Sequence, residues 1–149
     1  MNHEAWDHFS FLDFCGIHLC SSRPAANGRS VDEQAIRQLN EHVLKAYYLG
    51  QVKTLDKVED SDFVLSGDFG EIPWAQYLDS VRHRKENSTN VRVFVANARL
   101  RFYGDTALLT EVERYGEGDA FPRYETTSVW ARRGDSWKLV HMHFSKLSK

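Results

Sequence analysis

The sequence TSVWARRGDSWKLVHMHFS, residues 127–145, decides the fold. Apolar and polar residues alternate on both sides of Gly134 and Asp135, and a Gly-Asp pair between two alternating runs is typical of a tight β-hairpin. The segment RFYGDTALLT, residues 101–110, has the same form. Together the two segments predict an antiparallel meander. Its four expected strands lie near residues 91–103, 105–116, 122–133 and 136–146.

The first of these strands changes phase along its length. Apolar residues occupy odd-numbered positions up to Val95 and even-numbered positions from Ala96 onward. One extra residue in a strand, a β-bulge, produces such a shift and bends the sheet. We therefore predict a curved sheet.

Helical patterns precede the strands. Ser30 and Glu33 have the spacing of a capping box, which predicts the start of a helix that closes at Gly50. A second helix is expected over residues 52–58, then a short strand over 63–66 and a third helix that begins at Pro73. Because helices come first and an antiparallel sheet last, the predicted fold class is α+β.

We divide the chain into a leader, residues 1–29, and a domain, residues 30–149. The leader carries large aromatic residues and ends in a connector that contains Pro24 and Gly28. We expect it to pack as a helix on the domain, on a second copy of the chain, or as a lid.

The 149-residue chain has the composition of one globular domain, with 42% hydrophobic and 13% aromatic residues and a formal charge of -2. This composition argues against a disordered chain. No apolar run reaches the roughly 18 residues of a membrane helix, and the chain lacks the basic excess of a nucleic-acid-binding protein. We therefore expect neither membrane nor nucleic-acid partners.

The sequence contains no phosphate-binding loop, dinucleotide fingerprint, zinc-protease helix or nucleophile elbow, so we expect no cofactor. Cys15 and Cys20 have neither redox nor zinc-knuckle spacing, and we interpret them as reduced thiols. The first residues are acidic where a secretory signal carries Lys or Arg. These features predict a cytoplasmic location.

With the helices that precede them, residues 101–110 and 127–145 resemble the nuclear transport factor 2-like superfamily, a cone-shaped α+β fold that includes ketosteroid isomerase and SnoaL-like proteins. The resemblance covers about residues 30–147. It implies a curved antiparallel sheet wrapped around the helices, a pocket at the open end of the cone, and a homodimer formed through the outer sheet face.

The closing hairpin is most similar to the association domain of calcium/calmodulin-dependent protein kinase II. That domain lines its pocket with arginines at three positions, which correspond here to Glu113, Ser128 and Phe144. The resemblance implies that these three positions line a pocket in this chain as well, although without the positive charges.

Glu113 is the first candidate catalytic residue. If Glu113 and Ser128 point into the cone, Glu111, Tyr124 and Trp130 line the same cavity, because side chains alternate along a strand. A carboxyl group among aromatic rings has a raised pKa and can act as a general acid or base, with Tyr124 donating to a developing oxyanion. The alternative is that both glutamates are solvated and pair with cross-strand arginines.

His141 and His143 lie two residues apart on the last predicted strand, hence on one face. His143 is a second candidate for the acid or base, and His141 a candidate ligand contact. The pair also has the spacing of a metal site, but the sequence offers no convincing third ligand, so we expect no metal. The remaining alternative is a structural role.

Trp74 and Tyr47 are helical aromatic residues that can stack on a planar ligand, and Phe144 is a third aromatic candidate. Two functions remain open. One is a cofactor-free isomerase or lyase, of the polyketide cyclase or ketosteroid isomerase kind, that acts on a small apolar or aromatic ligand. The other is a non-catalytic module for ligand binding or oligomerisation.

Overall fold

The computed structural model describes residues 26–83, 92–116 and 122–148, which form three α-helices and a six-stranded sheet. The fold class is α+β, as predicted. The leader, apart from its last residues, lies outside the described residues, so its role stays a prediction. In chain order the elements are α1 (Ala26–Tyr48), α2 (Val52–Val58), β1 (Glu59–Gly67), β2 (Gly70–Pro73), α3 (Trp74–Arg82), β3 (Arg92–Tyr103), β4 (Thr106–Gly116), β5 (Arg123–Arg133) and β6 (Ser136–Lys146).

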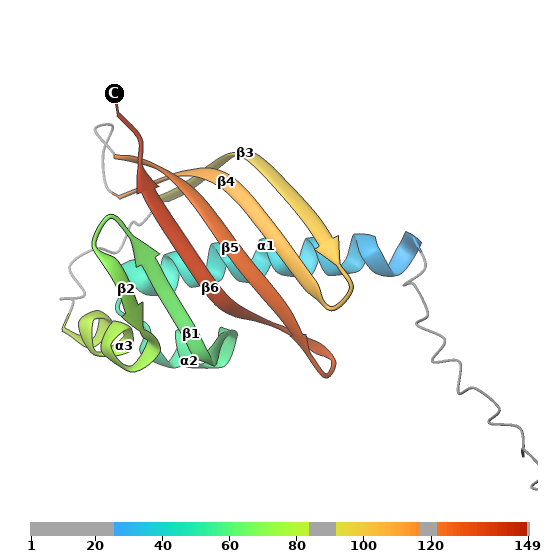
Figure 1. Cartoon of the computed structure of the whole chain (residues 1–149), viewed down its shortest axis with the longest axis horizontal. Helices are drawn as coiled ribbons and strands as arrows, with labels where there is room; N and C mark the ends of the chain where they lie inside the picture. The colour runs from blue at the N-terminus through green and yellow to red at the C-terminus, as the bar shows by residue number, and fades with distance from the viewer. Residues whose placement is uncertain (1–25, 84–91, 117–121, 149) are drawn as a thin grey trace, which may run out of the picture.

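The strands lie in the order β2-β1-β6-β5-β4-β3, and every neighbouring pair is antiparallel except β1 and β6. Figure 1 shows α1 running across one face of the curved sheet, with α2 and α3 beside β1 and β2. No described helix covers the opposite face, which we call the outer face. The antiparallel neighbours β3, β4, β5 and β6 confirm the predicted meander. The core lies between the inner face of the sheet and the helices.

The start of α1 differs from the prediction. The helix begins at Ala26, so Ser30 lies inside it and does not cap it. Glu33 does not turn back toward the helix start, because its carboxylate accepts a hydrogen bond from Arg37, one turn further on, at 2.7 Å. An i,i+4 ion pair of this kind supports a helix that continues through both residues.

Asp32 fastens this half of α1 to the sheet. Its carboxylate accepts hydrogen bonds from the indole of Trp137, at 3.0 Å, and from Arg132. Burial alone would raise the pKa of Asp32, but these two donors and the charge of Arg132 bring it below its usual range. The same guanidinium lies over the Trp137 ring, 4.4 Å from its centroid.

Two β-bulges shape the sheet. The predicted bulge in β3 is confirmed by a register shift between Ala96 and Arg99, with Asn97 in the left-handed region at φ 56°. A second bulge, which the sequence analysis did not predict, shifts the register of β6 against β5 between Leu139 and His141. It reverses which face each later residue of β6 occupies.

Strict alternation along β6 would place Trp137 and Leu139 on the same face as the two histidines, and the second bulge prevents this. Leu139 pairs with Trp130 on the inner face, but Thr127, which pairs with His143, belongs to the outer face. After the bulge, Met142 is the residue of β6 that enters the core.

No helix in the described part of the chain is long and apolar enough to cross a membrane.

Candidate active site

Two glutamates of β4 lie on the inner face of the sheet, next to polar residues of β5. In the antiparallel register, Glu113 lies opposite Tyr124 and Glu111 lies opposite Thr126. Paired residues of antiparallel strands point to the same face. Because Glu111, Glu113 and Thr126 are all buried, this register places a polar cluster inside the fold.

Asn40 joins the cluster from α1. Its side chain is buried, and its Nδ2 donates a hydrogen bond to Oε1 of Glu111. Asn40 and Glu111 line a pocket of about 400 Å³ between α1 and the strands β3 and β4. The wall on the β3 side is apolar, formed by Val93, Val95 and Ala98, whereas Arg37 and Glu41 line the α1 side.

Glu113 lies beside Glu111 and is completely buried, with 0% exposure. Burial raises the pKa of Glu113 to about 9, and the neighbouring carboxyl group of Glu111 adds to the rise, while Thr126 opposes it. A carboxyl group with this pKa keeps its proton at neutral pH. The two glutamates therefore form a coupled pair in which Glu113 holds a proton and Glu111 faces the pocket.

Several polar atoms of this cluster have no hydrogen-bond partner within the described ranges: Oδ1 of Asn40, both carboxyl oxygens of Glu113 and Oγ1 of Thr126. A buried polar group without a partner costs roughly 1–3 kcal/mol. Such groups are concentrated at sites that bind water or a ligand. The cluster therefore has hydrogen-bonding capacity that a polar molecule can satisfy.

A family model for the SnoaL-like domain matches residues 36–148, which is most of the chain. The chain belongs to the SnoaL-like domain family. The inner-face cluster of Asn40, Glu111, Glu113 and Thr126 lies entirely within the matched residues.

Solved structures of NTF2-like proteins share the fold of this SnoaL-like chain. A putative dehydratase of the NTF2-like family from Streptomyces avermitilis is 20% identical, with a TM-score of 0.69 over 81% of this chain and 99% of that one. The association domain of CaMKII from C. elegans is 17% identical, with a TM-score of 0.68 over 78% of this chain and 96% of that one. The CaMKII hub of S. rosetta is 23% identical, with a TM-score of 0.66 over 76% and 95%. At these identities the likeness shows the fold alone. A search of curated proteins finds no match.

The other predicted site residues of the SnoaL-like protein are spread over several parts of the fold. Tyr124 is half-buried beside the glutamate pair, and its ring contacts Phe144 edge-on, with 6.1 Å between the centroids. Ser128 and Trp130 are completely enclosed in the core, where the indole donates to the serine hydroxyl at 3.0 Å. Tyr47 stacks on Tyr77, with 5.7 Å between the ring centroids.

His141 and His143 lie on the outer face, away from Glu113. Both rings contact the hydroxyl of Ser66 on β1, His141 through Nε2 at 3.1 Å and His143 through Nδ1 at 2.9 Å. The fold therefore separates the two histidines from the glutamate pair by the thickness of the sheet. Over the residues that the model describes, no group of three or more metal-ligating side chains is present.

Trp74 lies apart from the glutamate pair and donates a hydrogen bond to Glu59 at a second pocket. The sequence analysis did not single out Glu59, Thr126 or Asn40. Asn40 had a usable signal, since it is a polar residue between Ile36 and Val43 on the apolar stripe of a helix. Glu59 and Thr126 carry no such signal, because neighbouring residues in sequence do not reveal their burial.

Proposed function

We propose that this SnoaL-like protein binds a small, largely apolar carbonyl compound between α1 and β3–β4 and moves a proton on it without a cofactor. The observation that carries the proposal is the buried Glu111–Glu113 pair, of which Glu111 lines a pocket of about 400 Å³. A carboxyl pair that shares a proton is suited to general acid–base catalysis. The apolar wall of β3 suits the hydrocarbon part of such a ligand.

In this proposal Glu111 is the group that meets the substrate. It accepts a proton from the carbon next to the carbonyl group, while Asn40 holds its carboxylate in place. Glu113 keeps a proton beside it and is a positioning and proton-storing residue. Tyr124, opposite Glu113, donates to the oxygen on which negative charge develops. The proton returns to a different atom of the substrate, or leaves with a hydroxyl group as water.

These two outcomes are isomerisation and dehydration, and both begin with the same proton abstraction. The fold likeness to a putative dehydratase is consistent with the second outcome but does not choose between them. One assay covers both, because a β,γ-unsaturated ketone that isomerises and a β-hydroxyketone that loses water each yield a conjugated enone with strong ultraviolet absorbance.

The test is turnover of both ketone classes, after a thermal-shift screen that includes steroids, polyketides and aromatic acids. Glu111→Gln is expected to lower the rate at least tenfold, because an amide cannot accept the proton. Glu71→Gln makes the same chemical change at an exposed position of β2 and is expected to retain the rate. Ligand binding without turnover would instead favour the non-catalytic module, and a loss confined to His143→Ala would contradict the role of Glu111.

We further propose that two copies of the chain associate through the outer face. Half-buried apolar side chains form the middle of this face, including Leu108, Val112 and Val129, and Phe94 near one edge is exposed. An uncovered apolar sheet face of this kind is typical of an interface. The CaMKII hub and association domains, which share this fold, are named for assembly.

Val129→Glu is expected to weaken the dimer at least tenfold, since it buries a carboxylate in the interface. Sedimentation of the wild type and of Val129→Glu over a range of concentrations measures this change in the dissociation constant of the dimer. Val31→Glu is the matched control, because Val31 is 67% exposed on α1 and lies away from the outer face. A wild-type protein that sediments as a monomer at micromolar concentration would exclude the dimer.

A further inference from the structure

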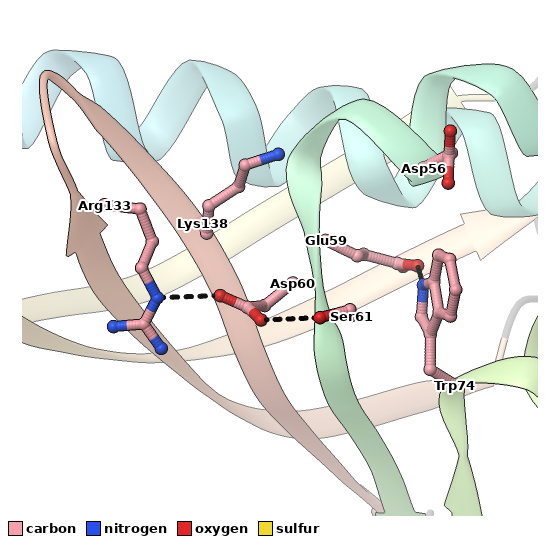
Figure 2. A pocket seen from close by; sticks show the side chains of 7 residues that line it. All are labelled: Asp56, Glu59, Asp60, Ser61, Trp74, Arg133 and Lys138. Carbon is pink, nitrogen blue, oxygen red and sulfur yellow. Dashed lines mark hydrogen bonds and ion pairs between the residues drawn. The ribbon is translucent and has the colours of Figure 1, made fainter.

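A second pocket, of about 290 Å³, lies where α2 meets β1. It shares no residue with the pocket beneath α1. Figure 2 shows its lining, with the side chains of Glu59 and Trp74 pointing toward one another. Asp56, on α2, lines the same pocket. Neither the family match nor the proposed proton transfer accounts for this cluster.

Glu59 is the group that calls for an explanation. It is the first residue of β1 and is only 2% exposed. The indole Nε1 of Trp74 donates to Oε2 of Glu59 at 3.2 Å, but Oε1 has no hydrogen-bond partner among residues 26–83, 92–116 and 122–148. A buried carboxyl oxygen without a partner favours a ligand that brings a donor.

The cations that line the pocket are already engaged. Arg133 donates to Asp60 at 2.9 Å, and the ammonium group of Lys138 donates to the backbone carbonyl of Lys57. Asp56 and Glu59, in contrast, have no cationic partner in the described portion of the chain. The part of the pocket next to Trp74 thus presents two carboxyl groups and an aromatic ring, and the two cations of its own lining are engaged elsewhere. Lys53 and Arg82 line the neighbouring pocket that shares Asp56 and Trp74.

We propose that this pocket binds the ammonium group of a small organic amine. The ammonium group donates to Oε1 of Glu59 and to the carboxylate of Asp56, and it lies against the indole of Trp74. Carboxylates and the face of a tryptophan ring both attract cations, and the attraction by the ring increases when the cation leaves water. Trp74 also lines an adjoining pocket of about 310 Å³, which gives room for the rest of the amine.

Proton release is expected to accompany binding. Burial raises the pKa of Glu59 to about 7; the side chains of Tyr77 and Trp74 oppose the rise, and the charge of Asp56 adds to it. Asp60, Arg133 and Lys138 complete the charged lining of the pocket. An ammonium ion stabilises the ionised form of Glu59, so affinity for the amine rises with pH up to about 7 and then levels off. An alkylammonium ion stays charged through this range, like the side chain of lysine.

The test is a calorimetric titration of the full chain with butylammonium, at pH 5.5 and pH 8, with butanol as the uncharged probe. The wild-type protein is expected to bind butylammonium about tenfold more tightly at pH 8, and more tightly than butanol, because Glu59 is ionised only at the higher pH. Glu59→Gln is expected to remove this pH dependence and to weaken binding about tenfold at pH 8.

Two further variants make the result interpretable. Asp56 is exposed, so Asp56→Asn tests the same site without disturbing the core, and it is expected to weaken binding. Glu71→Gln, at an exposed position of β2 outside this pocket, is expected to bind like the wild type. The proposal is overturned if butylammonium does not bind, if butanol binds equally well, or if Glu59→Gln leaves both the affinity and its pH dependence unchanged.

Discussion

Compared with the wild type, the Glu113→Gln variant is expected to gain free energy of unfolding as the pH rises from acid to neutral. Folding raises the pKa of this carboxyl group from 4.5 to about 9, mainly through burial and then through the neighbouring Glu111. Between these two values the folded state binds the proton more tightly than the unfolded state does. The free energy of unfolding of the wild-type protein therefore falls as the pH rises through this window.

Glutamine has the shape of the protonated glutamate but does not titrate. The free energy of unfolding of the variant therefore does not fall with pH in this way. Each pKa unit corresponds to about 1.4 kcal/mol, and by pH 7 the wild type is expected to lose about 3 kcal/mol relative to the variant. Urea unfolding at pH 4.5 and pH 7 measures the difference.

Glu125→Gln is the control for this experiment, because Glu125 is exposed on β5 and is expected to show no comparable change between the two pH values. If the stability difference between Glu113→Gln and the wild type stays constant with pH, the coupled pair does not hold a proton, and the proposed proton transfer loses its basis.

Trp130→Ala is expected to lower the free energy of unfolding by about 4 kcal/mol. Trp130 is 0% exposed and is the largest completely buried side chain of the described core. It lies in a row across the inner face, opposite Ala107 on one side and Leu139 on the other. Truncation leaves a cavity that this curved sheet cannot close, and it also removes the indole donor from the buried hydroxyl of Ser128.

Tyr103→Ala is the comparison for this effect, because Tyr103 is 61% exposed and its truncation is expected to change stability by less than about 0.5 kcal/mol. Chemical denaturation of the two variants beside the wild type measures both values. A loss below about 1 kcal/mol for Trp130→Ala would show that the inner face tolerates a void there, as expected of a ligand cavity rather than of a core.

The sequence predicted the strands well because their signals are local. The two Gly-Asp turns and the alternation around them depend only on near neighbours, and β3 to β6 begin and end within a residue or two of the predicted limits. The change of phase at Val95 also revealed the first bulge. The short strand β2 was not predicted, since four residues that pair only with β1 leave little pattern.

The site was only partly predictable. Alternation placed Glu111 and Glu113 on one face of β4, and both are buried. The hydrogen bond between Asn40 and Glu111, however, joins residues 71 positions apart, and no local pattern reveals such a contact. No local pattern reveals the contact between Glu59 and Trp74 either, because it forms only when α3 packs on β1.

By itself, the sequence determined the α+β class, the meander, the curvature of β3 and the resemblance to the superfamily, since each follows from short-range periodicity and turn chemistry. Only the tertiary structure decided which side chains reach the pocket. Side chains alternate with a period of two along a strand, so one inserted residue between Leu139 and His141 moves both histidines to the outer face. The strand β6 lies between β1 and β5, which are distant from each other in sequence, so no short-range pattern reveals where its register shifts.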